Sequence, residues 1–178
     1  RAVDIGCGAG VGAILIARAR REAEVLAVDI NPAALRLTAI NAALAEVANV
    51  EVQTSDVLQG TEGNFDLIVA NPPYMADPAG RAYRHGGGSL GAGLSLRIVE
   101  QALNRLAPGG SLLLYTGVAM VDGRDPFFDT VVPRLDSTRF GWTYRELDPD
   151  VFGEELLNPG YQRVDRIAVV ALTVTRIG

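Results

Sequence analysis

Apolar residues along this chain alternate between short continuous runs and longer stretches with helical spacing. Short runs rich in Val, Ile and Leu are typical of buried strands, whereas apolar residues on one face of a helical repeat indicate amphipathic helices. The runs predict strands at residues 1–5, 24–29, 50–53, 65–70, 111–116, 140–147 and 166–176. The helical repeats predict helices at residues 11–20, 33–47, 94–106 and 126–135. Strands that alternate with helices indicate an α/β fold with a mostly parallel sheet.

The two carboxyl-terminal strands depart from this alternation. Residues 140–147 and 166–176 are both β-rich, and they can close the sheet as an antiparallel pair. We therefore expect a Rossmann-like, seven-stranded, mostly parallel sheet with an antiparallel last strand and helices on both faces. At 178 residues, one α/β domain over 1–178 is expected, because this length supports a single full core.

A glycine-rich turn follows the first predicted strand. It reads Gly6-Cys7-Gly8-Ala9-Gly10 and leads into a helix with apolar residues at Val11, Ile14, Leu15 and Ala19. A strand, glycine loop and helix in this order are typical of nucleotide-binding sites. The second strand ends in Asp29, and an acidic residue there can accept hydrogen bonds from both hydroxyls of a ribose. At this point an NAD-dependent dehydrogenase fits as well as any other nucleotide-binding protein.

Two carboxylates favour S-adenosylmethionine over NAD. Asp4 precedes the glycine turn, where it would repel a pyrophosphate but can help to hold the ammonium of a methionine moiety. Asp56 follows the third strand, where it can accept a hydrogen bond from an adenine amino group. NAD shares only the adenosine half of this pattern.

The fourth strand is followed by Asn71-Pro72-Pro73-Tyr74. Two consecutive prolines hold the backbone rigid at the carboxyl end of the strand, where open α/β sheets bind ligands. The Asn71 amide oxygen and the Pro72 carbonyl are two acceptors that suit a planar NH2 group, and the Tyr74 ring offers a flat surface for it. These four residues predict methyl transfer to a planar nitrogen.

With these motifs the chain resembles the class I S-adenosylmethionine-dependent methyltransferases, in the branch that carries Asn-Pro-Pro-Tyr. The resemblance covers nearly the whole chain and implies the class I methyltransferase fold. It also implies catalytic roles for Asn71, Pro72 and Tyr74. The cofactor contacts that it implies are Asp4, Gly6, Cys7, Gly8, Gly10, Asp29, Ile30, Asp56, Val57 and Asn71.

The acceptor is less closely defined than the cofactor. The chain is most similar to the protein-glutamine methyltransferases that modify peptide release factors, which also carry a glycine-rich run and a Gly-Leu pair, as in 86–88 and 93–94 here. A protein glutamine is therefore the first choice of substrate, with a peptide release factor as the first protein to consider. The runner-up is an exocyclic amino group of adenine or guanine in RNA or DNA. The alternatives of another class are a non-catalytic nucleotide-binding module and a dehydrogenase.

Composition narrows the choice of partner. The formal net charge is −5, and all 16 basic residues are arginine, which disfavours nucleic acid because phosphate-binding proteins usually carry a basic face. No apolar run is long enough to cross a membrane, so no membrane partner is expected. The single Cys7 excludes an internal disulfide, and a cytoplasmic location is the default expectation. No metal is expected, because the chain shows no Cys, His and carboxylate set with ligand spacing.

Two loops are expected on the acceptor side. Residues 75–93 follow the acceptor motif and are glycine-rich, so they can form a lid or shape the substrate site. Residues 148–165 join the last two strands and bring Phe152, Tyr161 and the acids Asp150, Glu154 and Glu155 toward Asn71, provided that strand 140–147 runs parallel to the core strands. Because the chain begins directly on the first strand, we also expect that an upstream substrate-docking segment is missing.

Overall fold

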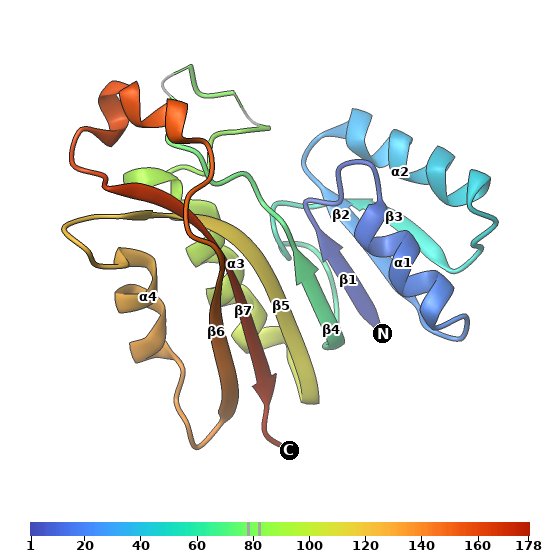
Figure 1. The fold of residues 1–178 in the computed structure, drawn as a ribbon. Coiled ribbons are helices and arrows are strands. Elements are labelled where there is room, and N and C mark those ends of the chain that lie inside the picture. The colour runs from blue at the N-terminus through green and yellow to red at the C-terminus, as the bar shows by residue number, and fades with distance from the viewer. Residues whose placement is uncertain (78, 82) are drawn as a thin grey trace.

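The predicted strands form one continuous sheet in the order β3-β2-β1-β4-β5-β7-β6 (Figure 1). The structure is a computed structural model, and it describes residues 1–77, 79–81 and 83–178. The strands are β1 (Ala2–Ile5), β2 (Val25–Asp29), β3 (Val50–Thr54), β4 (Phe65–Ala70), β5 (Leu106–Met120), β6 (Phe140–Asp148) and β7 (Arg166–Arg176). The expected seven-stranded sheet is confirmed.

Strand direction also follows the expectation. The pairs among β1 to β5 are all parallel, and β7 is antiparallel to both β5 and β6. Since β7 lies between β5 and β6, β6 runs parallel to the core strands. The connection from β6 to β7 therefore leaves the sheet at the same edge as the ends of β1, β2 and β4.

The register places four predicted site segments side by side. Ile5 pairs with Val28 on one side and with Ala70 on the other, and Asp29 pairs with Thr54. The residues that follow these positions are Gly6, Ser55 and Asn71, so the glycine turn, Asp29, the Asp56 turn and the acceptor motif leave one sheet edge together. Parallel strands impose this arrangement because all their carboxyl ends meet at the same edge.

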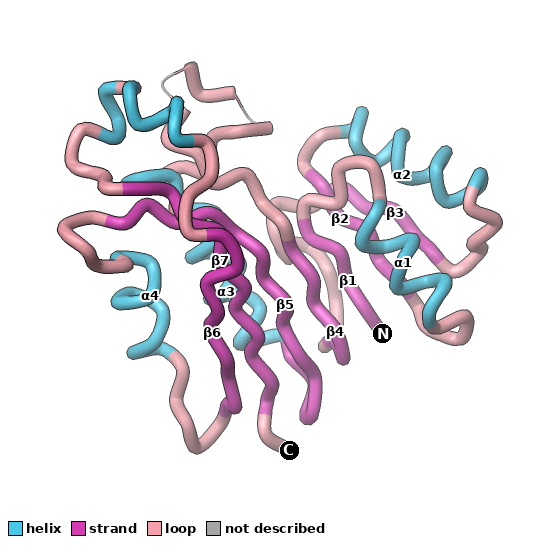
Figure 2. The backbone as a smooth tube through the Cα atoms, in the orientation of Figure 1, coloured by secondary structure: helices cyan, strands magenta, loops and turns pink. Residues whose placement is uncertain are grey.

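Helices cover both faces of the sheet, as expected (Figure 2). The helices are α1 (Val11–Ala19), α2 (Pro32–Leu44), α3 (Gly93–Arg105) and α4 (Pro126–Val131), with 3-10 turns at Ser89–Gly91, Val132–Arg134, Gly153–Leu157 and Pro159–Tyr161. Buried residues of α1 and α2 pack on one face, and those of α3 and α4 pack on the other. Within the described residues, no helix has the length and apolar content that a membrane crossing requires.

The main core lies between the sheet and the helices α3 and α4. Its fully buried side chains include Phe65, Ile68, Ile98, Leu106 and Leu112. Burying one such side chain contributes about 1.5–3 kcal/mol to folding before the entropy of ordering is subtracted. This layer fixes β4 and β5, and thereby the strand that carries Asn71.

Helix α1 is confirmed, but its buried face is not the predicted one. Val11 and Leu15, which indicated the helix, are 65% and 61% exposed, whereas Ala13 and Ala17 are buried. Small residues face the sheet because α1 packs closely against Ala27 of β2. In the same way, α2 buries Leu35 and leaves Leu37, Ile40 and Leu44 exposed on the surface.

Three elements differ from their predicted boundaries by more than one residue. Helix α2 ends at Leu44, three residues early, because Ala45 caps it and Glu46 adopts a positive φ of 55°. Strand β5 begins at Leu106, directly after α3, instead of at residue 111, and a register shift between Phe65 and Leu67 accommodates the extra residues. The helix predicted for 126–135 is α-helical only to Val131 and then continues as a 3-10 turn.

Candidate active site

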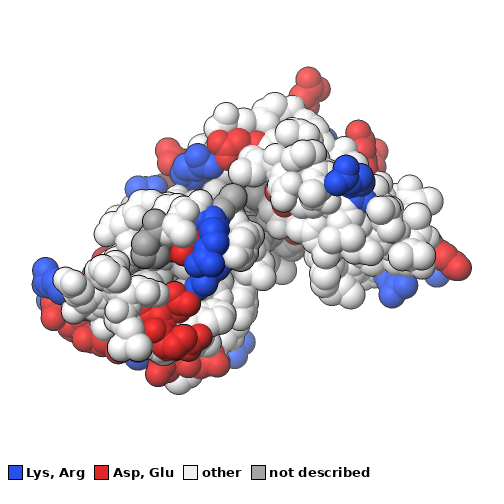
Figure 3. Space-filling view, turned by 90° about the horizontal axis from the view of Figure 1, so that it is seen from above, with Lys and Arg blue, Asp and Glu red and all other residues white. Residues whose placement is uncertain are grey.

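A cavity of about 1360 Å³ opens at the carboxyl ends of β1, β2 and β4. Seen from this end, the surface is hollowed between two raised parts of the molecule (Figure 3). The cavity has two halves. The cofactor half is lined by Ile5, Gly6, Gly8, Asp29, Ile30, Asn31, Ala34, Ser55, Asp56 and Val57. The acceptor half is lined by residues 71–75, 83–88, Tyr115, Phe152, Glu154 and Glu155.

The three glycines of the turn have different physical roles. All three have positive φ: 68° at Gly6, 55° at Gly8 and 83° at Gly10. A side chain added at Gly6 or Gly8 would meet almost nothing, so these two positions leave open space toward the cavity. At Gly10 an added Cβ would lie 2.7 Å from Thr38 of α2. Gly10 therefore serves packing and does not line the cavity.

The Asp29 carboxylate ties the glycine turn to the start of α2. One oxygen accepts a hydrogen bond from the Gly8 backbone N–H at 3.1 Å, and the other accepts one from the Asn31 N–H at 2.9 Å. Asn31 in turn caps α2 by accepting from the Ala33 N–H. A carboxylate has about four acceptor positions, so the remaining two can receive the hydroxyls of a ribose.

The turn after β3 is held by side chains from two directions. The Ser55 hydroxyl lies 3.0 Å from the Val57 carbonyl oxygen, and the Leu58 N–H donates to Gln101 of α3 at 3.0 Å. Val57 is buried with a φ of 57°, which is strained for a β-branched residue. The predicted adenine contact Asp56 forms an ion pair with Arg97 of α3, a partner that the sequence did not predict.

Asp4 lies beneath the glycine turn and does not line the main cavity. Its side chain is buried, accepts a hydrogen bond from the Ala13 N–H at 2.8 Å, and would lie 2.7 Å from a Cβ added at Gly12. Burial raises the pKa of Asp4 to about 6, and the Ala13 hydrogen bond opposes part of this rise. Asp4 and Cys7 line a second cavity of about 670 Å³ that also reaches Asn71.

Cys7 is a packing residue in this structure. Its sulfur is buried and accepts a hydrogen bond from the Thr38 hydroxyl at 3.3 Å. Burial raises the pKa of the Cys7 thiol to about 11, so it stays protonated and unreactive at neutral pH. The implied cofactor contact of Cys7 stays a prediction.

The acceptor motif forms the wall between the two halves of the cavity. Asn71 is exposed and lines both cavities, whereas Pro72 is buried. The Tyr74 ring lies against Gly117 of β5, where any side chain would overlap the ring. Glycine at 117 therefore allows the Tyr74 ring to pack directly against the backbone of β5.

The glycine-rich stretch after the motif packs backbone against backbone. An added Cβ at Gly91 would overlap the Tyr74 carbonyl oxygen, and one at Gly86 would overlap the Gly91 carbonyl oxygen. The Met75 N–H donates to Arg84, and the Gly86 N–H donates back to Met75. These contacts support the substrate-shaping interpretation of 75–93 over a lid. Within that stretch, Pro78 and Ala82 lie outside the described residues.

The second predicted loop reaches the cavity as expected. Phe152, Glu154 and Glu155 line its acceptor half. Tyr161 is buried beneath the loop, and Asp150 does not line the cavity. Sequence reasoning missed Tyr83, Arg84, Arg97 and Tyr115, which also line it. No spacing signal could have identified these residues, because their contacts depend on distant segments.

Metal coordination finds no support in the described part of the chain. Residues 1–77, 79–81 and 83–178 contain no group of three or more His, Cys, Asp or Glu side chains that could hold an ion. His85 lines the cavity as an exposed residue of the glycine-rich stretch.

Comparison with known proteins identifies the family. The Methyltransferase small domain family matches residues 1–120. A release factor glutamine methyltransferase of Deinococcus radiodurans is 35% identical over 168 residues, which cover 87% of this chain and 55% of that protein. A ribosomal RNA small subunit methyltransferase C of Pasteurella multocida is 36% identical over 113 residues, which cover 63% of this chain and 31% of that protein.

Solved structures share the fold. A ribosomal protein L11 methylase from Lactobacillus delbrueckii subsp. bulgaricus superimposes with a TM-score of 0.61 at 21% identity, over 99% of this chain and 70% of that chain. The chain spans about half the length of the Deinococcus relative. The sequence-based resemblance to the class I methyltransferases is thereby confirmed, and the chain belongs to the methyltransferase small domain family.

Proposed function

We propose that this domain transfers a methyl group from S-adenosylmethionine to a planar nitrogen, with the side-chain amide of a protein glutamine as the first choice. The observation that carries the proposal is the position of Asn71-Pro72-Pro73-Tyr74 at the junction of the two halves of one cavity. A methyl donor in one half and an acceptor in the other would meet at Asn71.

The cofactor half has hydrogen-bond acceptors that suit S-adenosylmethionine. Asp29 retains acceptor positions for the ribose, Asp56 lies at the next strand end for the adenine, and Gly6 and Gly8 leave room for the methionine arm. Asp4, beneath the glycine turn, would neutralise the ammonium of a bound methionine arm, directly or through water. When bound, S-adenosylmethionine supplies an electrophilic methyl group on a sulfonium.

An amide nitrogen is a weak nucleophile because its lone pair is delocalised. The residues of the acceptor half would counter this weakness. The Asn71 amide oxygen and the Pro72 carbonyl would accept the two N–H hydrogens of the acceptor, which aims its lone pair at the cofactor half. Transfer then depends on positioning and on stabilising the positive charge that develops on nitrogen. Tyr74 contributes a flat surface and a cation–π interaction.

No side chain has to act as a general base before transfer. The methylated nitrogen is strongly acidic while it carries the extra proton, so it can release that proton to water. The catalytic roles thus belong to Asn71, Pro72 and Tyr74, all three of which line the cavity.

The choice of a protein glutamine rests on the relatives and on charge. The Deinococcus relative is named a release factor glutamine methyltransferase, and the net charge of −5 disfavours nucleic acid. The Pasteurella relative supports a nucleic-acid base as the second choice of acceptor, because its name gives ribosomal RNA as the substrate. A release factor is therefore the first substrate to test, and an adenine or guanine amino group is the second.

Two assays test this function. In a thermal-shift assay, S-adenosylmethionine and S-adenosylhomocysteine should raise the melting temperature and NAD should not. Stabilisation by NAD alone would contradict the methyltransferase proposal and favour a dehydrogenase. Labelled methyl transfer to release-factor protein, transfer RNA and DNA then identifies the acceptor, and binding without transfer to any of them indicates a non-catalytic nucleotide-binding module.

A further inference from the structure

The connection between β6 and β7 crosses the acceptor half of the cavity. We call residues 149–165 the strap. Phe152 lies on the strap, lines the cavity and is 47% exposed, so its ring borders open space. Phe152 belongs to none of the motifs that indicated the cofactor and acceptor residues.

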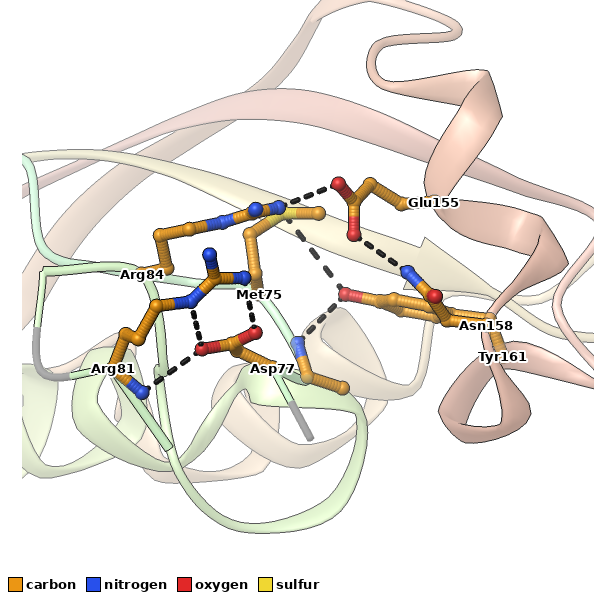
Figure 4. A network of polar contacts seen from close by, with 8 residues as sticks. Met75, Asp77, Arg81, Arg84, Glu155, Asn158 and Tyr161 are labelled. Carbon is orange, nitrogen blue, oxygen red and sulfur yellow. Dashed lines mark hydrogen bonds and ion pairs between the residues drawn. The ribbon is translucent and has the colours of Figure 1, made fainter. Parts of the chain in front are cut away.

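Two polar contacts fix the strap to the stretch 75–93, and a third lies within the strap itself (Figure 4). The Ala76 N–H donates to the hydroxyl of Tyr161 at 2.7 Å, and the Tyr161 ring is buried. Arg84 pairs with Glu155 at 2.6 Å, and the Asn158 side-chain amide donates to the other oxygen of Glu155 at 2.7 Å. These contacts leave Phe152 little freedom to move away from the acceptor motif.

Phe152 faces the catalytic aromatic residue. The ring centroids of Tyr74 and Phe152 are 6.4 Å apart, and the ring planes are tilted by 46°. Tyr74 is held from below by the β5 backbone at Gly117. The two rings therefore converge over the same part of the cavity from different elements.

The backbone of Phe152 is strained. Its φ is 55° and its ψ is 40°, which is the left-handed region that glycine or asparagine adopts far more easily than phenylalanine. A bulky aromatic residue at such a position is typical of a functional constraint. The strained backbone therefore adds to the evidence from the cavity lining and from the Tyr74 contact.

We propose that Phe152 is a specificity-determining residue that forms the second aromatic wall of the acceptor site. Tyr74 and Phe152 would contact a flat amide and the aliphatic arm that carries it, while Asn71 and Pro72 hold its N–H groups. The inference rests on the proposed methyl transfer to a planar nitrogen. The strap residues Tyr161 and Glu155 are positioning residues for this wall.

Replacing the ring by glycine separates a substrate role from a structural one. Phe152→Gly should keep or raise the melting temperature, because it relieves the left-handed strain. With release-factor protein as acceptor, its KM should rise by roughly 10-fold and its kcat should change less, since aromatic contacts of this kind contribute about that factor. Phe152→Tyr should restore the wild-type KM, and the affinity for S-adenosylhomocysteine should be unchanged in both variants.

Leu157 provides a matched control on the same strap. It is 90% exposed and does not line the cavity, so Leu157→Ala should leave the acceptor KM unchanged. If Phe152→Gly turns over release factor with the wild-type KM, the inference is wrong. If the wild-type protein transfers methyl to none of release factor, transfer RNA and DNA, the proposed function fails instead.

A binding measurement tests the role of Phe152 without requiring methyl transfer. The probe is an S-adenosylhomocysteine derivative whose sulfur carries a short arm that ends in a primary amide. Wild-type protein should bind it roughly 10-fold more tightly than S-adenosylhomocysteine, and Phe152→Gly should lose that gain. An equal gain in both proteins, or no gain in the wild type, would overturn the proposal.

Discussion

The two halves of the cavity are built from contacts of very different sequence range. In the cofactor half, Asp29 binds the Gly8 N–H across 21 positions, and each predicted residue follows the end of a strand. In the acceptor half, Arg84 pairs with Glu155 across 71 positions, and Ala76 binds Tyr161 across 85. The strand ends thus position most of the cofactor half, in which Asp56 still pairs with Arg97 across 41 positions. The acceptor half depends on two loops that meet only in the folded protein.

The largest expected effect is at the junction of the halves. Asn71→Ala should slow methyl transfer by on the order of 10²–10³, because it removes one preorganised polar group. Cofactor affinity should stay within a few-fold of wild type in calorimetry. Asn64 lies just before the other end of the same strand and is exposed, so Asn64→Ala is the matched control. A wild-type rate for Asn71→Ala would contradict the planar-nitrogen mechanism.

The next effect concerns the buried acid of the cofactor half. The pKa of Asp4 is about 6 in the folded protein and 3.8 as its ordinary value, so ionising Asp4 destabilises the fold as pH rises across this window. Relative to Asp4→Asn, wild-type protein should lose up to about 3 kcal/mol of unfolding free energy between pH 4 and pH 7. Denaturant titrations of both proteins at several pH values measure this difference. A constant difference across that range would show that Asp4 does not titrate there.

The same acid links pH to cofactor binding. If ionised Asp4 neutralises the ammonium of S-adenosylmethionine, wild-type affinity should increase as pH rises through about 6. The affinity of Asp4→Asn should be flat over that range. Parallel pH profiles for the two proteins would remove Asp4 from the cofactor site.

The next prediction concerns Asp29 and its expected contact with the ribose. Asp29→Ala should weaken S-adenosylmethionine binding by roughly 1.5–3 kcal/mol, because charged hydrogen bonds to the ribose are lost. The variant also loses the bonds to the Gly8 and Asn31 N–H groups, so Asp29→Asn, which keeps one acceptor oxygen, should be milder. Unchanged affinity in a folded Asp29→Ala protein would exclude the ribose contact.

The smallest expected effect concerns Tyr161, which holds the strap in the acceptor half. Tyr161→Phe leaves the Ala76 N–H without its hydroxyl acceptor and should lower the free energy of unfolding by roughly 1 kcal/mol. The acceptor KM should rise a few-fold, while cofactor affinity stays unchanged. Weaker cofactor binding in this variant would show that the two halves are not independent.

The different sequence ranges of the contacts in the two halves explain which parts of the site could be predicted from the sequence. The seven strands and the placement of Gly6, Asp29, Asp56 and Asn71 at one edge follow from apolar runs and from the rule that parallel strands end at one edge. The order of the strands in the sheet was not predicted. The buried face predicted for α1 was wrong because close packing favours Ala13 and Ala17 over the larger residues Val11 and Leu15.

The partners of the site residues carry no such local signal. Arg97 beside Asp56 and Arg84 beside Glu155 are contacts between distant segments, and an arginine in a sequence does not indicate its partner. Gly117 follows the predicted strand 111–116 and carries no signal in the sequence, whereas the structure places the Tyr74 ring against it. Only the folded arrangement of β5, the strap and the acceptor motif reveals these roles.

The most direct test of the central claim is to locate the transferred methyl group. Release-factor protein would be incubated with wild-type domain and isotopically labelled S-adenosylmethionine, digested, and sequenced by mass spectrometry, with Asn71→Ala in parallel. The account predicts one labelled methyl on a glutamine side-chain nitrogen, formed by the wild type and on the order of 10²–10³ more slowly by the variant. Label on a carboxylate, a lysine or a carbon atom, or equal labelling by both proteins, would contradict it.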